Sequence, residues 1–119
     1  MFVSIGNGLF VELNCVLALE HKKKIEQFIS LRKDWYPYPL QAWEEKFGSR
    51  AIALVYSEDR SEGYEKNCAE IFLLANEKFA LVTESGCSCY EAERDAEIEL
   101  FPTITEAKQQ MKKFFKRWE

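Results

Sequence analysis

The 119-residue sequence contains no apolar run close to the roughly 20 residues that cross a bilayer. Its first ten residues place no basic residue ahead of the apolar positions, as a secretory signal would. Internal repeats, low-complexity tracts and linkers rich in glycine or serine are also missing. We therefore expect one cytoplasmic domain, residues 1–119, that is neither a repeat protein nor bound to membranes.

Motifs of the common enzyme classes are absent as well. The sequence has no glycine loop for phosphate, no nucleophile elbow and no zinc-protease helix. Its single histidine, His21, precedes three lysines and has no obvious carboxylate to orient it, so we interpret it as a solvated residue at a helix start. The pattern predicts a protein that is not an enzyme and binds no cofactor.

The four cysteines do not form the C-x2-C pairs that are typical of zinc sites. In a reducing cytoplasm we expect thiols or metal ligands and no disulfides. Cys87 and Cys89 share one loop and are the candidates for a metal or redox site. Cys15 and Cys68 lie in apolar runs and are expected to be buried. The alternative is a structural loop with packed thiols.

The formal net charge is −4 and the sequence pI is about 5.2. Binding to nucleic acid or anionic lipid requires Lys and Arg to neutralise phosphates, so this balance disfavours both kinds of partner.

In the first half, Phe2–Ile5 reads as a short strand that enters a tight turn at Gly6–Gly8. Residues 9–19 are apolar at every odd position, which favours a strand, although their propensity favours a helix. A helix is predicted from His21, with apolar residues on one face. A short helix over residues 42–47 should end at Gly48 as its C-terminal cap.

The second half predicts short strands over residues 51–56, 69–75, 78–84 and 96–101, with a charged loop at 57–66. A two-residue turn is expected at Asn76–Glu77. Thr103 and Glu106 form a capping box that opens an amphipathic C-terminal helix. The predicted fold class is α+β, an antiparallel sheet of about four or five strands with helices packed mainly on one face. The apolar residues at helical spacing in the last element are Ile104, Ala107, Met111, Phe114, Phe115 and Trp118.

Acidic residues occupy alternate positions before and within the last predicted strand. In an extended chain they would line one face, with apolar residues on the other. Such a row could present a negative field to a basic surface, or it could be an edge strand kept soluble by charge. The residues of this row are Glu91, Glu93, Asp95, Glu97 and Glu99.

An aromatic loop contains the residue types that are enriched at interface hot spots. Its candidate contact residues are Trp35, Tyr36 and Tyr38. They would anchor a partner or a second copy of the chain, or would cap the protein's own core.

These features favour a small acidic protein-binding module that acts on a partner with a basic surface. Inhibitors of nucleic-acid-handling proteins, such as phage anti-defence and toxin-immunity proteins, are often of this size and charge. The partner would be another protein and not nucleic acid, and a homodimer is possible. The alternative is a thiol-based metal-binding or redox accessory protein that uses Cys87 and Cys89. A structural subunit of a larger assembly fits the same sequence.

Overall fold

The computed structural model describes residues 1–6, 8–31, 47–63, 65–87 and 95–116. The chain divides into two compact units. Unit 1 comprises Met1–Val55 and Phe72–Lys78, and unit 2 comprises Tyr56–Ile71 and Phe79–Glu119.

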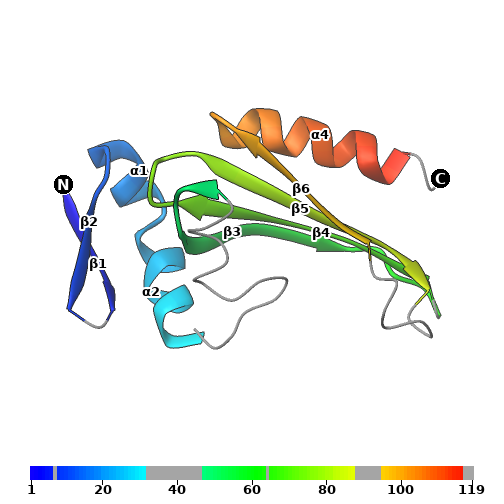
Figure 1. Cartoon of the computed structure of the whole chain (residues 1–119), viewed down its shortest axis with the longest axis horizontal. Helices are drawn as coiled ribbons and strands as arrows, with labels where there is room; N and C mark the ends of the chain where they lie inside the picture. Colours follow the sequence, from blue (N-terminus) through cyan, green and yellow to red (C-terminus); the bar gives the residue numbers. More distant parts are fainter. Residues whose placement is uncertain (7, 32–46, 64, 88–94, 117–119) are drawn as a thin grey trace. The chain divides into compact units, whose positions relative to one another are not determined.

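The elements follow the order β1 (Phe2–Gly6), β2 (Leu9–Glu12), α1 (Cys15–Glu20), α2 (Lys22–Leu31), β3 (Ala51–Asp59), β4 (Glu65–Leu74), β5 (Phe79–Cys87), β6 (Asp95–Phe101) and α4 (Ile104–Lys116) (Figure 1). β1 and β2 form a two-stranded antiparallel sheet, and the other strands form a four-stranded antiparallel sheet in the order β3-β4-β5-β6. The predicted α+β class with an antiparallel sheet is confirmed.

The core of unit 1 lies under α2, whose apolar face matches the helical period that the sequence predicted. Ile25 is fully buried and Phe28 nearly so. The ring of Phe28 meets that of Phe72, from β4, in an edge-to-face arrangement with the ring centroids 6.2 Å apart. Such a pair adds stability beyond the area it buries.

In unit 2, α4 packs against β5 and β6. The buried side chains of α4 are Ala107, Met111, Phe114 and Phe115. Two cations lie over aromatic rings: the guanidinium of Arg60 is 4.6 Å from the ring centroid of Phe115, and Nζ of Lys108 is 4.7 Å from that of Tyr56. The predicted amphipathic helix is therefore confirmed as far as Lys116, while Trp118 lies outside the described residues.

Residues 9–19 do not form the single strand that their alternating pattern suggested. They form β2 and then α1, and the change occurs at Asn14, whose Oδ1 accepts a hydrogen bond from the N–H of Val16 at 2.9 Å. A side-chain oxygen at this position satisfies one of the free N–H groups of a first helical turn. The helix propensity of Leu, Ala and Glu prevails once this cap is present.

Two further expectations needed adjustment. The strand predicted over residues 51–56 continues to Asp59, so the expected charged loop begins later. The connection from β4 to β5 spans residues 75–78 and is not a two-residue turn. Within it Glu77 adopts a positive φ of 71°. Gly48 has the positive φ expected of a helix cap and follows the helical Phe47, while residues 42–46 of the predicted helix lie outside the described residues.

Candidate protein-binding surfaces

The β1–β2 hairpin in unit 1 has one buried and one exposed face, and its register decides which side chains lie on each. Phe2 pairs with Glu12 and Ser4 pairs with Phe10. Paired residues and alternate residues of a strand share a face, so all four lie on the same side. The opposite face carries Ile5, which is buried, in the strand that α2 packs against.

The outer face of the hairpin is unusually apolar for a surface. Phe2 is 70% exposed and Phe10 is 65% exposed. Among the described residues, all the exposed large hydrophobic side chains except Leu100 come from the first 19 residues. We call this set the N-terminal apolar surface, and its members are Met1, Phe2, Leu9, Phe10, Val16 and Leu19.

Backbone groups of the hairpin are also available for pairing. Met1 and Leu13 exchange hydrogen bonds of 2.9 and 3.0 Å between their main-chain groups. Bonded and non-bonded pairs alternate along an antiparallel ladder, so the N–H and C=O groups of Phe10 and Glu12 point away from β1. No third strand joins this sheet within the part of the chain that the structure describes. Among the described residues, the outer edge of β2 is therefore an unpaired edge.

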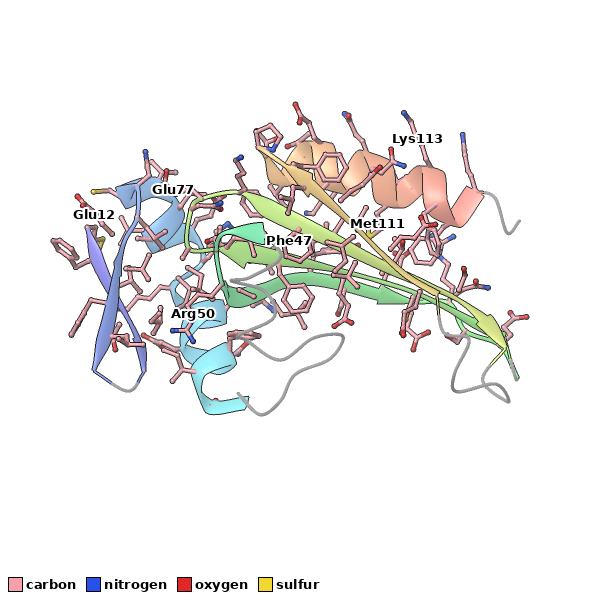
Figure 2. The ribbon with its side chains drawn as sticks, in the orientation of Figure 1. Glu12, Phe47, Arg50, Glu77, Met111 and Lys113 are labelled. Atoms are coloured by element: carbon pink, nitrogen blue, oxygen red, sulfur yellow. The ribbon has the colours of Figure 1, made fainter. Side chains whose placement is uncertain are left out.

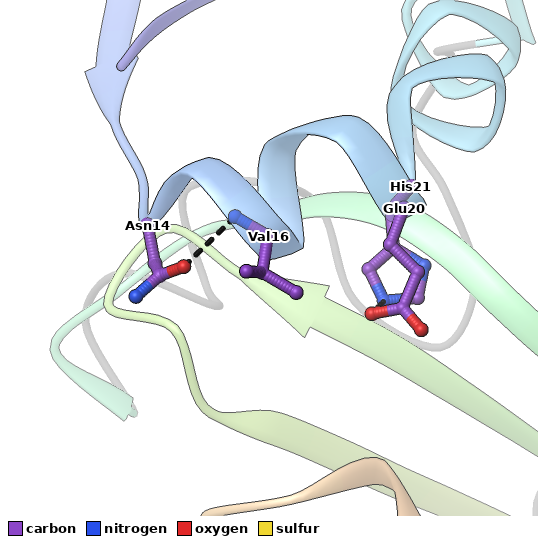
Figure 3. Close-up of polar contacts among 4 residues, drawn as sticks. All are labelled: Asn14, Val16, Glu20 and His21. Atoms are coloured by element: carbon purple, nitrogen blue, oxygen red, sulfur yellow. Dashed lines mark hydrogen bonds and ion pairs between the residues drawn. The ribbon is translucent and has the colours of Figure 1, made fainter.

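β2 leads directly into α1, which adds apolar surface to the same unit (Figure 3). Val16 and Leu19, three residues apart on this helix, are 68% and 65% exposed. Cys15 is also exposed, which contradicts the expectation that it is a buried small hydrophobe.

An open groove of about 620 Å³ lies where β2 ends. It is lined by Met1, Glu12, Leu13, Asn14, Cys15, Ala75, Asn76 and Glu77. Its wall is held by a hydrogen bond from the N–H of Asn14 to Oε1 of Glu77. Figure 2 labels both glutamates of this groove, beside the hairpin and α1. The side chain of Glu12 is exposed and makes no hydrogen bond or ion pair with the described residues. The carboxylates of Glu12 and Glu77 and the ammonium of Met1 give the groove a net negative charge.

The predicted acidic row is described only in part. Glu97 and Glu99 are exposed on β6, an edge strand, and pair with Thr83 and Leu81 of β5. These four residues and the α4 residues Gln110 and Phe114 line a small pocket of about 60 Å³. The two carboxylates therefore lie on the side of the sheet that carries α4. Asp95 begins the strand, and Glu91 and Glu93 lie outside the described residues.

The aromatic candidates Trp35, Tyr36 and Tyr38 also lie outside the described residues.

The thiols do not assemble into a metal site within the described ranges. No group of three or more His, Cys, Asp or Glu side chains there could hold an ion. Cys87 ends β5 and Cys89 lies outside the description. Cys68 is half-buried, and its Sγ donates a hydrogen bond to Oε2 of the buried Glu84 at 3.3 Å. Cys68 thus packs beside a carboxylate within the sheet.

His21 is buried, so the expectation of a solvated histidine was wrong. It sits at the junction of two helices, where its N–H donates to the carbonyl of Leu17 and its carbonyl accepts from the N–H of Ile25. Its Nε2 lies 3.9 Å from Oε2 of Glu20 (Figure 3).

Among the described residues, no helix is long and apolar enough to span a bilayer.

The chain matches no protein-family model, and the comparisons with curated proteins and with solved structures give no match. These surfaces are therefore the features that indicate a function. The sequence predicted β1 and the turn after it, but not that the outer face of the hairpin is apolar and exposed. The available signal was Phe2 and Phe10 in a short hairpin where alternate residues must share a face.

Proposed function

We propose that the chain is a protein-binding module that acts by binding and blocking a surface of another protein, and not by catalysis. The observation that carries this proposal is the exposed outer face of the β1–β2 hairpin, with Phe2 and Phe10. Contiguous apolar surface of more than a few hundred Å² typically marks an interaction site. Exposed aromatic rings are also the residues that most often supply binding energy at interfaces.

The partner that we propose has a basic contact surface. Supporting this are the net charge of −4, the exposed Glu97 and Glu99 of β6, and the carboxylates of Glu12 and Glu77 beside the apolar residues. Inhibition of a nucleic-acid-handling protein, as in phage anti-defence and toxin-immunity proteins, remains our proposal for the biological role. Opposite charges would steer the encounter and apolar contacts would hold the complex.

The test compares the native chain with the double variant Phe2→Ser/Phe10→Ser. The untagged chain is purified from its source cells, and a stoichiometric partner is identified by native mass spectrometry. Affinity for that purified partner should then fall at least about 30-fold for each ring removed, because a hot-spot residue contributes roughly 2 kcal/mol or more.

Glu97→Lys/Glu99→Lys is a second double variant of exposed residues, and it should weaken binding through slower association alone. Neither variant should change the free energy of unfolding by more than about 0.5 kcal/mol per residue, because all four side chains are exposed. A folded double-phenylalanine variant that binds the partner as tightly as the native chain would refute the proposal.

A further inference from the structure

The free edge of β2 and the groove beside it together indicate how a partner docks. We propose that β2 accepts an extended segment of the partner protein as a third strand, and that a basic side chain of this segment enters the groove lined by Glu12 and Glu77. This inference rests on the proposed protein-binding function and specifies the chemistry of the bound segment.

The backbone of β2 supplies the first argument. The N–H and C=O groups of Phe10 and Glu12 point outward, and no described strand pairs with them. An added strand would satisfy these groups with main-chain hydrogen bonds, which give affinity without depending on the partner's sequence. Most proteins block or cover such an edge because it attracts other strands. Here the edge strand carries the exposed Phe10 and Glu12.

Side chains supply the second argument. Residues of an added strand would lie directly opposite Phe10 and Glu12, on the same exposed face. An apolar or β-branched side chain fits opposite Phe10, and a basic side chain fits opposite Glu12. Because Glu12 also lines the groove with Glu77, a lysine or arginine there would meet two carboxylates. The bound segment should therefore combine apolar and basic residues.

Charge disfavours one pairing of β2 with a second copy of this chain, the one centred on Val11. A symmetric antiparallel pairing of two β2 strands, centred on Val11, would place Phe10 opposite Glu12 of the second copy. The two Glu12 carboxylates would then be near neighbours on one face, each beside a groove that is already acidic. Like charges close together across strands are destabilising. A basic partner segment avoids this repulsion.

The size of the surface fits such a complex. The exposed side chains of the N-terminal apolar surface amount to on the order of 500 Å², whereas a stable interface takes about 800 Å² from each partner. An area below that of a stable interface suits a short extended segment, which covers less surface than a folded partner. A short extended segment would cover the hairpin edge and its apolar face without requiring any part of unit 2.

The experiment uses capped hexapeptides as probes, one alternating valine with lysine and its control alternating valine with glutamate. Binding to the full-length chain is followed by NMR, and hydrogen exchange is measured for each backbone amide. The lysine peptide should bind at least tenfold more tightly than the glutamate peptide. The amides of Phe10 and Glu12 should become at least tenfold more protected, while that of Val11, which faces β1, should not change.

The variant Glu12→Lys is a charge-reversal control on an exposed side chain. It should lower the affinity for the lysine peptide at least tenfold and raise the affinity for the glutamate peptide. In both the native chain and the variant, the bound peptide should still protect the backbone amides at positions 10 and 12. Binding without added amide protection would overturn strand addition. Equal affinity for both peptides would overturn the proposal that a basic side chain enters the groove.

Two outcomes separate this inference from the proposed function. Protection of Phe10 that appears without peptide as the protein concentration rises would identify a second copy as the occupant and overturn the inference. No peptide binding at millimolar concentration, with a natural partner still dependent on Phe2 and Phe10, would overturn strand addition and leave the binding function standing. Loss of that dependence would overturn the function itself.

Discussion

At the scale of single residues, Asn14 and Glu77 decide the local structure beside the hairpin. The side chain of Asn14 caps α1, while its N–H donates to Oε1 of Glu77. Glu77 is the described non-glycine residue with a positive φ, at 71°. A left-handed backbone disfavours residues with a Cβ, so the hydrogen bond to Asn14 offsets part of that cost. One turn residue thereby ties the β4–β5 connection to the start of α1 within unit 1.

This arrangement predicts different stabilities for two truncations of Glu77. Glu77→Ala keeps the cost of the positive φ and loses the hydrogen bond, so it should lower the free energy of unfolding by about 1 kcal/mol. Glu77→Gly loses the same bond but relieves the backbone, so it should be more stable than the alanine variant by about 1 kcal/mol. Urea denaturation of both variants checks this. A glycine variant less stable than the alanine variant would contradict it.

Residue patterns explain why the sequence misled over residues 9–19. Apolar odd positions suit a strand, and no local signal in that run outweighs them except the cap at Asn14. The exposure of Val16 and Leu19 shows that an apolar position need not face the core. Burial depends on contacts with segments that are distant in sequence, such as the connection that contains Glu77. The alternation of residues within one segment carries no information about those contacts. His21 was misread for the same reason, because its burial is set by tertiary packing.

At the scale of elements, α4 is the best test of local signals. Thr103→Ala should destabilise the protein by about 1 kcal/mol, because its Oγ1 accepts a hydrogen bond from the N–H of Glu106 at 3.2 Å. Thr103→Ser keeps the hydroxyl and should remain within about 0.5 kcal/mol of the native chain. Thermal and urea unfolding monitored by circular dichroism measure both changes. Equal destabilisation by alanine and serine would argue that the methyl group matters and the cap does not.

The elements also differ in how far they could be predicted. α4 was predictable because its capping residues, its helical period and its buried face all lie within one segment. The alternation on β6 was predictable too, since Glu97 and Glu99 share one side of the strand. The open edge of β2 was not, because a strand's neighbours are set by the topology of the sheet. Phe2 and Phe10 resemble core residues until the register shows that they share an exposed face.

At the scale of the whole molecule, two kinds of surface suggest two roles in one binding event. Net charge of −4 and the exposed carboxylates act over distances of about a Debye length, ~10 Å at 0.1 M salt. The N-terminal apolar surface acts only on contact. In the proposed complex, long-range charge would govern how fast a basic partner arrives, and desolvated contacts would govern how long it stays.

This division predicts how salt and mutation should affect the two rate constants, measured by surface plasmon resonance with the purified partner. Raising sodium chloride from 50 to 500 mM should slow association roughly tenfold or more and change dissociation by less than about threefold. Glu97→Lys/Glu99→Lys should slow association only, because these residues lie on the exposed β6 edge. Phe2→Ser/Phe10→Ser should speed dissociation and leave association nearly unchanged. If charge reversal on β6 raises the dissociation rate constant as much as loss of the two rings does, the contact would lie on the acidic strand. The hairpin would then not contribute to binding.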